Sequence, residues 1–284
     1  MSIELAKKYA PYTDELFKAE SKISLLTNTD FDWTGAHSVS VWKVSTAPMN
    51  NYARNRGGDG DSEDPATLSR FGKILDLSAQ TEEMLLKKDR SFIFNIDKLD
   101  QDETANQVNA ATALARQVRE VVIPEVDTYT YGVMVENAGT VAEAAALTPE
   151  NIYDEIVTGS EALDDAEVPD TERVIVVTPA TYRIMKKSPD ILMDSDISEE
   201  MRLKGVISMV DGMAVVKVPT NRLPAGFGFM IAHPSATVAP VKLEDYGTHS
   251  DTVLSSGTIV TGRICYDAFV LDNKADTIYY HPVA

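Results

Sequence analysis

Polar and apolar residues alternate over short stretches in the first hundred residues of the chain. The segments SVSVWKV at 38–44 and SFIFNID at 91–97 alternate at every second position, which predicts strands with one buried face. KILDL at 73–77 is a further candidate strand. The stretch 45–72 is rich in Asn, Gly, Asp, Pro and Ser and has no periodicity, and compact domains rarely contain such a loop unless it is functional or disordered. Two strands joined in this way predict a long projecting hairpin.

A helical period replaces this alternation between Asp102 and Ile123. One stripe of the expected helix consists of small or branched residues at helical spacing. Its members are Ala105, Val108, Ala111, Thr112, Ala115, Val118 and Val122. Small side chains predict that another element packs closely against this stripe. Pro124 is expected to kink or end the helix, because it lacks the N–H group that bonds to the preceding turn.

Residues 140–235 have the pattern of a compact α/β unit. Thr148-Pro149 and Thr178-Pro179 each place a threonine N-cap before a proline, which predicts a helix after each pair. RVIVV at 173–177 predicts a buried strand, and Asp211-Gly212 predicts a tight hairpin turn. After this unit the pattern alternates nearly to the C-terminus, which predicts long antiparallel strands. The elements together indicate an α+β fold.

The sequence carries a strong excess of acidic residues, with 44 Asp and Glu against 26 Lys and Arg and a net charge of −18. Such a surface repels a phosphate backbone, which disfavours sequence-independent nucleic-acid binding through a basic patch. It also disfavours binding to an anionic membrane surface. The simplest role of the charge is to keep the chain in solution.

The single cysteine, Cys265, excludes an intrachain disulfide, and its apolar surroundings in RICYDAFVL predict a small buried hydrophobe. The N-terminal segment MSIELAKKYAPYTDEL lacks the apolar core of a signal peptide and is typical of an arm with short helical pieces. No stretch reaches the ~18 apolar residues of a membrane span. We therefore expect a protein that stays in, or is assembled in, a cytoplasm without membrane contact.

No catalytic constellation is visible in the sequence. The four histidines, His37, His233, His249 and His281, are scattered, and no pair has the spacing of a metal site. One cysteine excludes thiolate metal sites, GxSxG is absent, and no phosphate-binding loop is complete. We expect a protein that is not an enzyme, with no catalytic residue, no cofactor and no metal.

The stretch RNRGGDGDSED is the strongest candidate for a ligand loop. Asp59, Asp61 and Glu63 have the spacing of the first ligands in an EF-hand calcium loop. However, Asp64 stands where that loop needs a glycine, and its twelfth position is an arginine. A dinucleotide fingerprint fails as well, because Glu63 replaces its last glycine. A solvated acidic loop explains the segment better, while a calcium-binding module or a cytoplasmic enzyme that uses it remains an alternative.

The order of the predicted elements is arm, long hairpin, strand, long helix, α/β unit and returning strands. This order resembles the major capsid proteins of tailed bacteriophages, the Hong Kong 97-like fold, which encapsulins and herpesvirus shells share. DRSFIFNIDKLDQDETANQVNAATALARQVREVVIPEVD at 89–127 is similar to the family's stretch in which a strand of the peripheral domain feeds the spine helix. GRICYDAFVLDNKADTIYYH at 262–281 is also typical of these proteins.

The resemblance implies a division of the chain into an arm, an extended loop and two discontinuous domains. These would be the N-terminal arm 1–33, the extended loop 34–84, the peripheral domain 85–135 with the return strands 236–269, and the axial domain 136–235 with the C-terminal strand 270–284. The peripheral domain would contain the spine helix.

The resemblance also implies the major capsid (coat) protein of a tailed double-stranded DNA bacteriophage or prophage. Such a virion protein assembles in the bacterial cytoplasm into an icosahedral shell around the genome. Its partners would be other copies of itself in pentamers and hexamers, a separate scaffolding protein, a portal and, where one is used, a decoration protein. Sequence-specific nucleic-acid binding is not expected. An encapsulin-type nanocompartment shell is the alternative.

Within this resemblance, the projecting hairpin would contact neighbouring copies. Trp42 would need cover from a neighbour, since a projecting hairpin cannot bury it. Arg54 and Arg56 would meet acids of a neighbouring copy, and Asp59 and Asp61 would meet its bases. These five residues are the predicted inter-subunit contacts.

Overall fold

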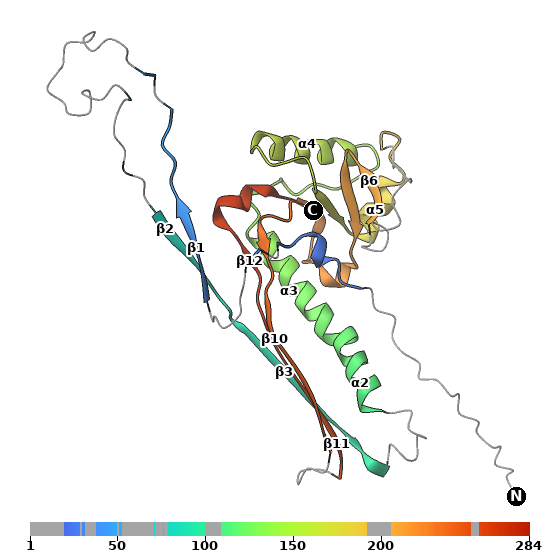
Figure 1. Ribbon diagram of the computed structural model, residues 1–284. Coiled ribbons are helices and arrows are strands. Elements are labelled where there is room, and N and C mark those ends of the chain that lie inside the picture. The colour runs from blue at the N-terminus through green and yellow to red at the C-terminus, as the bar shows by residue number, and fades with distance from the viewer. Residues whose placement is uncertain are drawn as a thin grey trace, which may run out of the picture. The chain divides into compact units, whose positions relative to one another are not determined.

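The computed structural model describes residues 20–28, 30–31, 38–49, 51–52, 71, 76, 79–99, 109–191, 206–250 and 256–284. These residues belong to two compact units. The first, here called the hairpin unit, spans 35–85, and the second, the large unit, comprises 1–34 and 86–284 (Figure 1).

The hairpin unit is built on two antiparallel strands, β1 (Ser38–Val44) and β2 (Ala79–Leu85). Trp42 pairs with Thr81, and Lys43 forms an ion pair of 2.9 Å with Glu82. The first strand was expected at this place. The expected strand at 73–77 lies almost wholly outside the described residues, and the partner of β1 is the polar segment AQTEEML. Gln80 and Glu82 share one face of β2 with the buried Met84, so its sequence has no apolar alternation and the pattern gave no signal for it.

A six-stranded mixed sheet forms the centre of the large unit, in the order β4-β13-β8-β5-β7-β6. The strands are β4 (Thr140–Val141), β5 (Val174–Val177), β6 (Val206–Val210), β7 (Met213–Lys217), β8 (Phe227–Ala232) and β13 (Ile278–Pro282). The β6–β7 turn confirms the predicted hairpin, because Asp211 and Gly212 both have positive φ. β5 confirms the predicted buried strand, with all four residues buried.

Helices cover both faces of this sheet, since alternate residues of β5 point to opposite sides. Ile175 and Val177 pack with α4 (Ile152–Asp165) and α5 (Pro179–Met185). Val174 and Val176 face the other way and pack with the C-terminal part of the long helix described below. The sheet therefore lies between two apolar cores.

The predicted threonine caps had different outcomes. Thr178 caps α5 as expected, with its Oγ1 accepting the N–H of Thr181 at 3.0 Å. Thr148 does not cap α4, because the helix begins only at Ile152. The side chain of Asn151 turns back instead and accepts the N–H of Thr148 at 2.7 Å, which holds the preceding residues in a turn.

The glycine in the middle of α4 lets the helix lie close to the sheet. A Cβ at Gly159 would be 2.8 Å from the Tyr279 ring and 2.9 Å from the Ile231 side chain. We expect Gly159→Ala to lower the free energy of unfolding by about 1–2 kcal/mol, because overpacking outweighs the better helix propensity of alanine. Chemical denaturation measures this change. Thr158→Ala, at an exposed position beside it, is the control and should change stability by less than about 0.5 kcal/mol. An equally stable Gly159→Ala protein would contradict the close packing.

A three-stranded antiparallel sheet, in the order β10-β11-β3, forms the second part of the large unit. Its strands are β3 (Lys88–Asp97), β10 (Val241–Ser250) and β11 (Gly257–Tyr266). They confirm the strand predicted at 91–97 and the long antiparallel strands predicted near the C-terminus. Cys265 on β11 is half-buried rather than fully buried.

One continuous helix packs on this sheet, and it differs from the predicted one. It comprises α2 (Ala110–Gln117), a π-helical turn η3 (Val118–Val122) and α3 (Ile123–Glu136). Pro124 does not end the helix, because the wider π turn before it already shifts the hydrogen bonding, with Ile123 N–H donating to the carbonyl of Val118. The sequence predicted that the helix kinks or ends at Pro124. The second of these outcomes is wrong, because the helix continues to Glu136.

The predicted apolar stripe is correct only at the C-terminal end of its range. Val118 and Val122 pack on Ile264 and Tyr266 of β11. In contrast, three earlier members of the stripe, Ala111, Thr112 and Ala115, are exposed. Ala105 and Val108 lie outside the described residues. The stripe fails because α2 has no buried side chain, and the first buried residue of the described helix is Val122 in the π turn.

Short elements complete the large unit. They are the 3₁₀ turns η1 (Ile23–Leu25), η4 (Thr220–Arg222) and η5 (Asp272–Thr277) and the strand pair β9 (Thr237–Val238) with β12 (Phe269–Val270). Asn28 forms an isolated bridge with Val238, so the segment from Glu20 onwards is part of the folded unit.

Candidate functional site

One face of the hairpin β1–β2 exposes two large apolar side chains. Trp42 and Val44 lie two positions apart on β1 and share this face, and they are 69% and 59% exposed. Their partners on β2, Thr81 and Ala79, are exposed as well. Two strands have no second layer to cover such a face, so it is a candidate contact surface.

Trp42 is the member of the predicted inter-subunit set that the structure describes. Arg54, Arg56, Asp59 and Asp61 lie outside the described residues. Their predicted contacts therefore remain predictions.

An aromatic pair lies beyond the paired strands of the hairpin unit. The rings of Tyr52 and Phe71 meet edge to face, with centroids 5.1 Å apart and an interplanar angle of 68°. Both rings nevertheless remain exposed. Exposed apolar surface thus continues past the two strands towards the loop.

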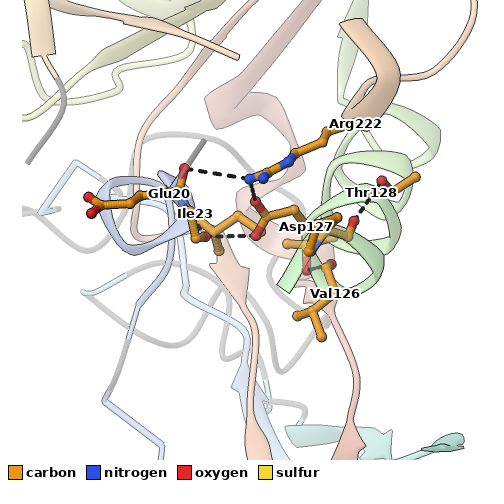
Figure 2. A network of polar contacts seen from close by, with 9 residues as sticks. Glu20, Ile23, Val126, Asp127, Thr128 and Arg222 are labelled. Carbon is orange, nitrogen blue, oxygen red and sulfur yellow. Dashed lines mark hydrogen bonds and ion pairs between the residues drawn. The ribbon is translucent and has the colours of Figure 1, made fainter. Parts of the chain in front are cut away.

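In contrast to the exposed apolar face of the hairpin unit, a buried ion pair lies inside the large unit. Figure 2 shows Arg222 of η4 beside Asp127 of α3, with Nη1 2.6 Å from Oδ2 and each side chain 3% exposed. The second carboxylate oxygen of Asp127 accepts the hydroxyl of Ser21 at 2.7 Å. Arg222 Nη1 also donates to the carbonyl of Glu20 at 3.5 Å. Three segments that are far apart in the sequence therefore meet at one carboxylate.

The pKa of Asp127 reflects opposing effects. Burial raises the pKa of this carboxyl, while the hydrogen bond from Ser21 and the charge of Arg222 lower it. Removing one partner of such a pair leaves an uncompensated buried charge. The function of this network is attachment: it joins residues 20–28, with the buried Ile23 and Leu26, to the helix and the sheet.

A second polar network lies where the long helix meets β3 and β11. It borders an open hollow of about 480 Å³ lined by Lys88, Pro124, Glu125, Thr128, Tyr129 and Tyr266. The Tyr129 hydroxyl donates to Asp267 at 2.7 Å, and the Tyr266 hydroxyl donates to Glu125 at 3.2 Å. The ammonium of Lys88 lies 4.7 Å from the centroid of the Tyr129 ring.

These tyrosines are hydrogen-bond donors rather than acid–base groups. Burial, followed by the nearby Glu125, raises the pKa of Tyr266 to about 12. Burial and the bond to Asp267 raise the pKa of Tyr129 further still. Both hydroxyls therefore keep their protons at neutral pH and join the helix to the sheet.

The described histidines do not assemble a reactive site. His281 is fully buried, stacked on Phe229, with its Nε2 3.3 Å from Glu155, an ion-pair distance without hydrogen-bond geometry. His233 bonds to Ser235, and His249 lies near Thr261. Within the described ranges, no group of three His, Cys, Asp or Glu side chains could hold a metal ion. Likewise, none of the described helices combines the length and apolarity that crossing a bilayer requires.

Solved structures are similar to this chain over nearly its whole length. A chain of Mycobacterium phage Che8 has a TM-score of 0.75 at 18% identity, covering 98% of this chain and 96% of that chain. The capsid structure of the cyanophage P-SCSP1u has a TM-score of 0.74 at 13% identity, covering 98% and 93%. The mature capsid of bacteriophage PhiM1 has a TM-score of 0.68 at 14% identity, covering 99% and 92%. The chain has the Hong Kong 97-like capsid fold. No model of a protein family matches the sequence, and no curated protein does either.

The Hong Kong 97-like fold was the expectation from the order of elements, and it is confirmed. Sequence reasoning nevertheless missed the pair Asp127–Arg222. The sequence did contain a signal for a buried acid. If the helix is continued past Pro124, Asp127 falls on its apolar face. Ending the predicted helix at Pro124 removed that signal.

Proposed function

We propose that this protein is the major capsid protein of a tailed double-stranded DNA bacteriophage or prophage. Many copies would assemble in the bacterial cytoplasm into an icosahedral shell that encloses the genome, so the role is structural rather than catalytic. The observation that carries the proposal is the match over 98% of this chain and 96% of a phage chain. A match of this extent includes the hairpin unit, not only the central sheet.

The proposed division of the chain follows the arrangement of its sheets. Residues 34–84 would be the extended loop, which is supported by the compact unit at 35–85. The peripheral domain, 85–135 with 236–269, would hold the three-stranded sheet and much of the long helix. The axial domain would comprise the six-stranded sheet of 136–235 with 270–284.

Contacts between copies are proposed to form through the hairpin unit. The exposed face with Trp42 would lie on a neighbouring copy, and the charged residues Arg54, Arg56, Asp59 and Asp61 would pair with that neighbour. A contact between different patches that is repeated by rotation closes into rings, here proposed to be pentamers and hexamers. A strongly acidic wall would also not hold packaged DNA tightly.

Other partners of the proposed shell follow from its task. A separate scaffolding protein would set the curvature during assembly, and a portal would admit the DNA. A decoration protein could bind the finished surface.

Electron microscopy of the purified protein, alone and coexpressed with a scaffolding protein, tests the proposal. We expect closed shells or five- and six-membered capsomers. A monomer or dimer that persists at every concentration and with scaffold would overturn it. Deletion of 54–64 should leave a folded subunit with weaker assembly, and normal assembly of that variant would remove the proposed role of the four charged residues.

A further inference from the structure

The exposed face of α5 is basic, although the whole chain has a net charge of −18. Arg183, Lys186 and Lys187 are exposed on and just after α5, and Lys217 is exposed at the end of β7. The ammonium groups of Lys186 and Lys217 lie 5.1 and 5.4 Å from the centroid of the same ring, that of Tyr182. We name these four bases the basic flank.

The bases of the basic flank have no acidic partner in the described part of the chain. No ion pair joins any of the four to a carboxylate there, whereas other cations of the large unit, such as Arg90, Arg173 and Arg222, do pair. Two ammonium groups that share one ring repel each other. In an acidic protein, a basic cluster that has no acidic partner among the described residues favours an acidic partner.

The neighbouring helix α4 has the opposite charge. Its sequence IYDEIVTGSEALDD contains five acids and no base. Asp164 is engaged with the buried Arg173 at 2.7 Å, but Asp154, Glu161 and Asp165 are exposed. We name these three exposed acids the acidic flank.

The two flanks lie towards different sides of one sheet. Both helices pack on the same face, α4 against β13 and α5 against β5. In the strand order β4-β13-β8-β5-β7-β6, the acids therefore lie towards β4 and the bases towards β6. α4 and α5 also contact each other, so the two flanks are neighbours on this face of the sheet (Figure 1). A surface that carries acids on one helix and bases on the next can meet another copy of itself with acids against bases.

We propose that the basic flank of one copy binds the acidic flank of the next copy, as a head-to-tail contact. This inference rests on the proposed function, because it requires copies arranged in rings. Each copy then uses one flank towards each neighbour, and the contact closes by rotation. Exposed ion pairs are screened by salt, so the contact directs which flanks meet more than it holds them together.

Charge reversal on each flank, separately and together, tests the contact. Lys186→Glu with Lys187→Glu reverses the basic flank, and Glu161→Lys with Asp165→Lys reverses the acidic flank. We expect either double variant to raise the critical concentration for assembly about tenfold or more at low salt, since attractive pairs become repulsive. The fourfold variant carries both reversals and should assemble within about threefold of the parent, because the flanks are complementary again.

Light scattering and electron microscopy at low and high salt measure these effects. The control is Lys87→Glu with Lys242→Glu, which changes the net charge equally beside the three-stranded sheet and should assemble like the parent. An equimolar mixture of the two double variants should also associate, as each supplies the flank that the other lacks. Circular dichroism checks that each variant is folded.

The outcomes separate this inference from the proposed function. If the parent forms shells and both double variants form them at the same concentration, the flank contact is wrong and the capsid function stands. If reversing the basic flank impairs assembly but the fourfold variant does not recover, the bases bind another acidic partner, such as DNA, and the contact between copies is overturned. If the parent forms no shell or capsomer, both proposals fall.

Discussion

Arg222→Ala is expected to lower the free energy of unfolding of the large unit by about 3–5 kcal/mol. The guanidinium is the cationic partner of Asp127, and both side chains are almost completely buried. Its removal leaves a carboxylate in the interior with only the Ser21 hydroxyl as a described side-chain donor. Chemical denaturation at neutral pH measures the loss.

The pH dependence of this loss identifies its cause. Burial already raises the pKa of Asp127, and removing the positive charge raises it further. The folded variant then takes up a proton that the unfolded chain does not yet bind, so its stability rises as the pH falls. The difference from the parent should therefore shrink between pH 7 and pH 5.

Two variants serve as controls for Arg222→Ala. Asp127→Leu with Arg222→Met removes both charges and should recover much of the loss, because an apolar pair leaves no buried charge. Ser21→Ala removes the hydrogen bond to Asp127 and a longer one of 3.4 Å from the N–H of Ile23, and should cost about 1–2 kcal/mol. If Arg222→Ala lost less stability than Ser21→Ala, the pair would not be the main attachment of residues 20–28.

Trp42→Glu is expected to raise the critical concentration for shell assembly roughly 30-fold, which corresponds to about 2 kcal/mol per contact. The side chain is 69% exposed in the subunit, so its loss should not affect folding. In the proposed shell the same side chain is covered by a neighbour, and a buried carboxylate there would be costly. Assembly is followed by light scattering and electron microscopy.

The matched control keeps an aromatic ring on the same face of the hairpin. Trp42→Phe should assemble within a few-fold of the parent, since it retains most of the apolar area. Unfolding curves of unassembled Trp42→Glu and parent protein should coincide. Shells of Trp42→Glu that form as readily as those of the parent would remove this face from the interface.

Local sequence patterns predicted the strands and turns whose conformation depends on only a few neighbouring residues. β1, β3, β5 and the β6–β7 turn follow from alternation, burial and the Asp211-Gly212 pair, all of which act over a few residues. β2 had no such signal, because the face of AQTEEML that holds the buried Met84 also holds Gln80 and Glu82. The limits of the long helix were also missed, since they depend on which part of it the sheet covers.

The candidate sites were less predictable than the fold for a related reason. The exposure of Trp42 could be expected from a projecting hairpin. The ion pair of Asp127 with Arg222 joins residues 95 positions apart, so no local pattern contains both. The charges of α4 and α5 are visible in the sequence, but their places on one sheet depend on the strand order, which is a tertiary property.

The π turn at Val118–Val122 has a consequence for how the two sheets are coupled. One helix supplies Val122 to the core of the three-stranded sheet and Tyr131 with Met134 to a core of the six-stranded sheet. Successive side chains of an α-helix are about 100° apart around its axis. One extra residue in a turn therefore rotates the side chains before the turn relative to those after it. The π turn therefore sets how the part of the helix that packs on the three-stranded sheet is rotated relative to the part that packs on the six-stranded sheet.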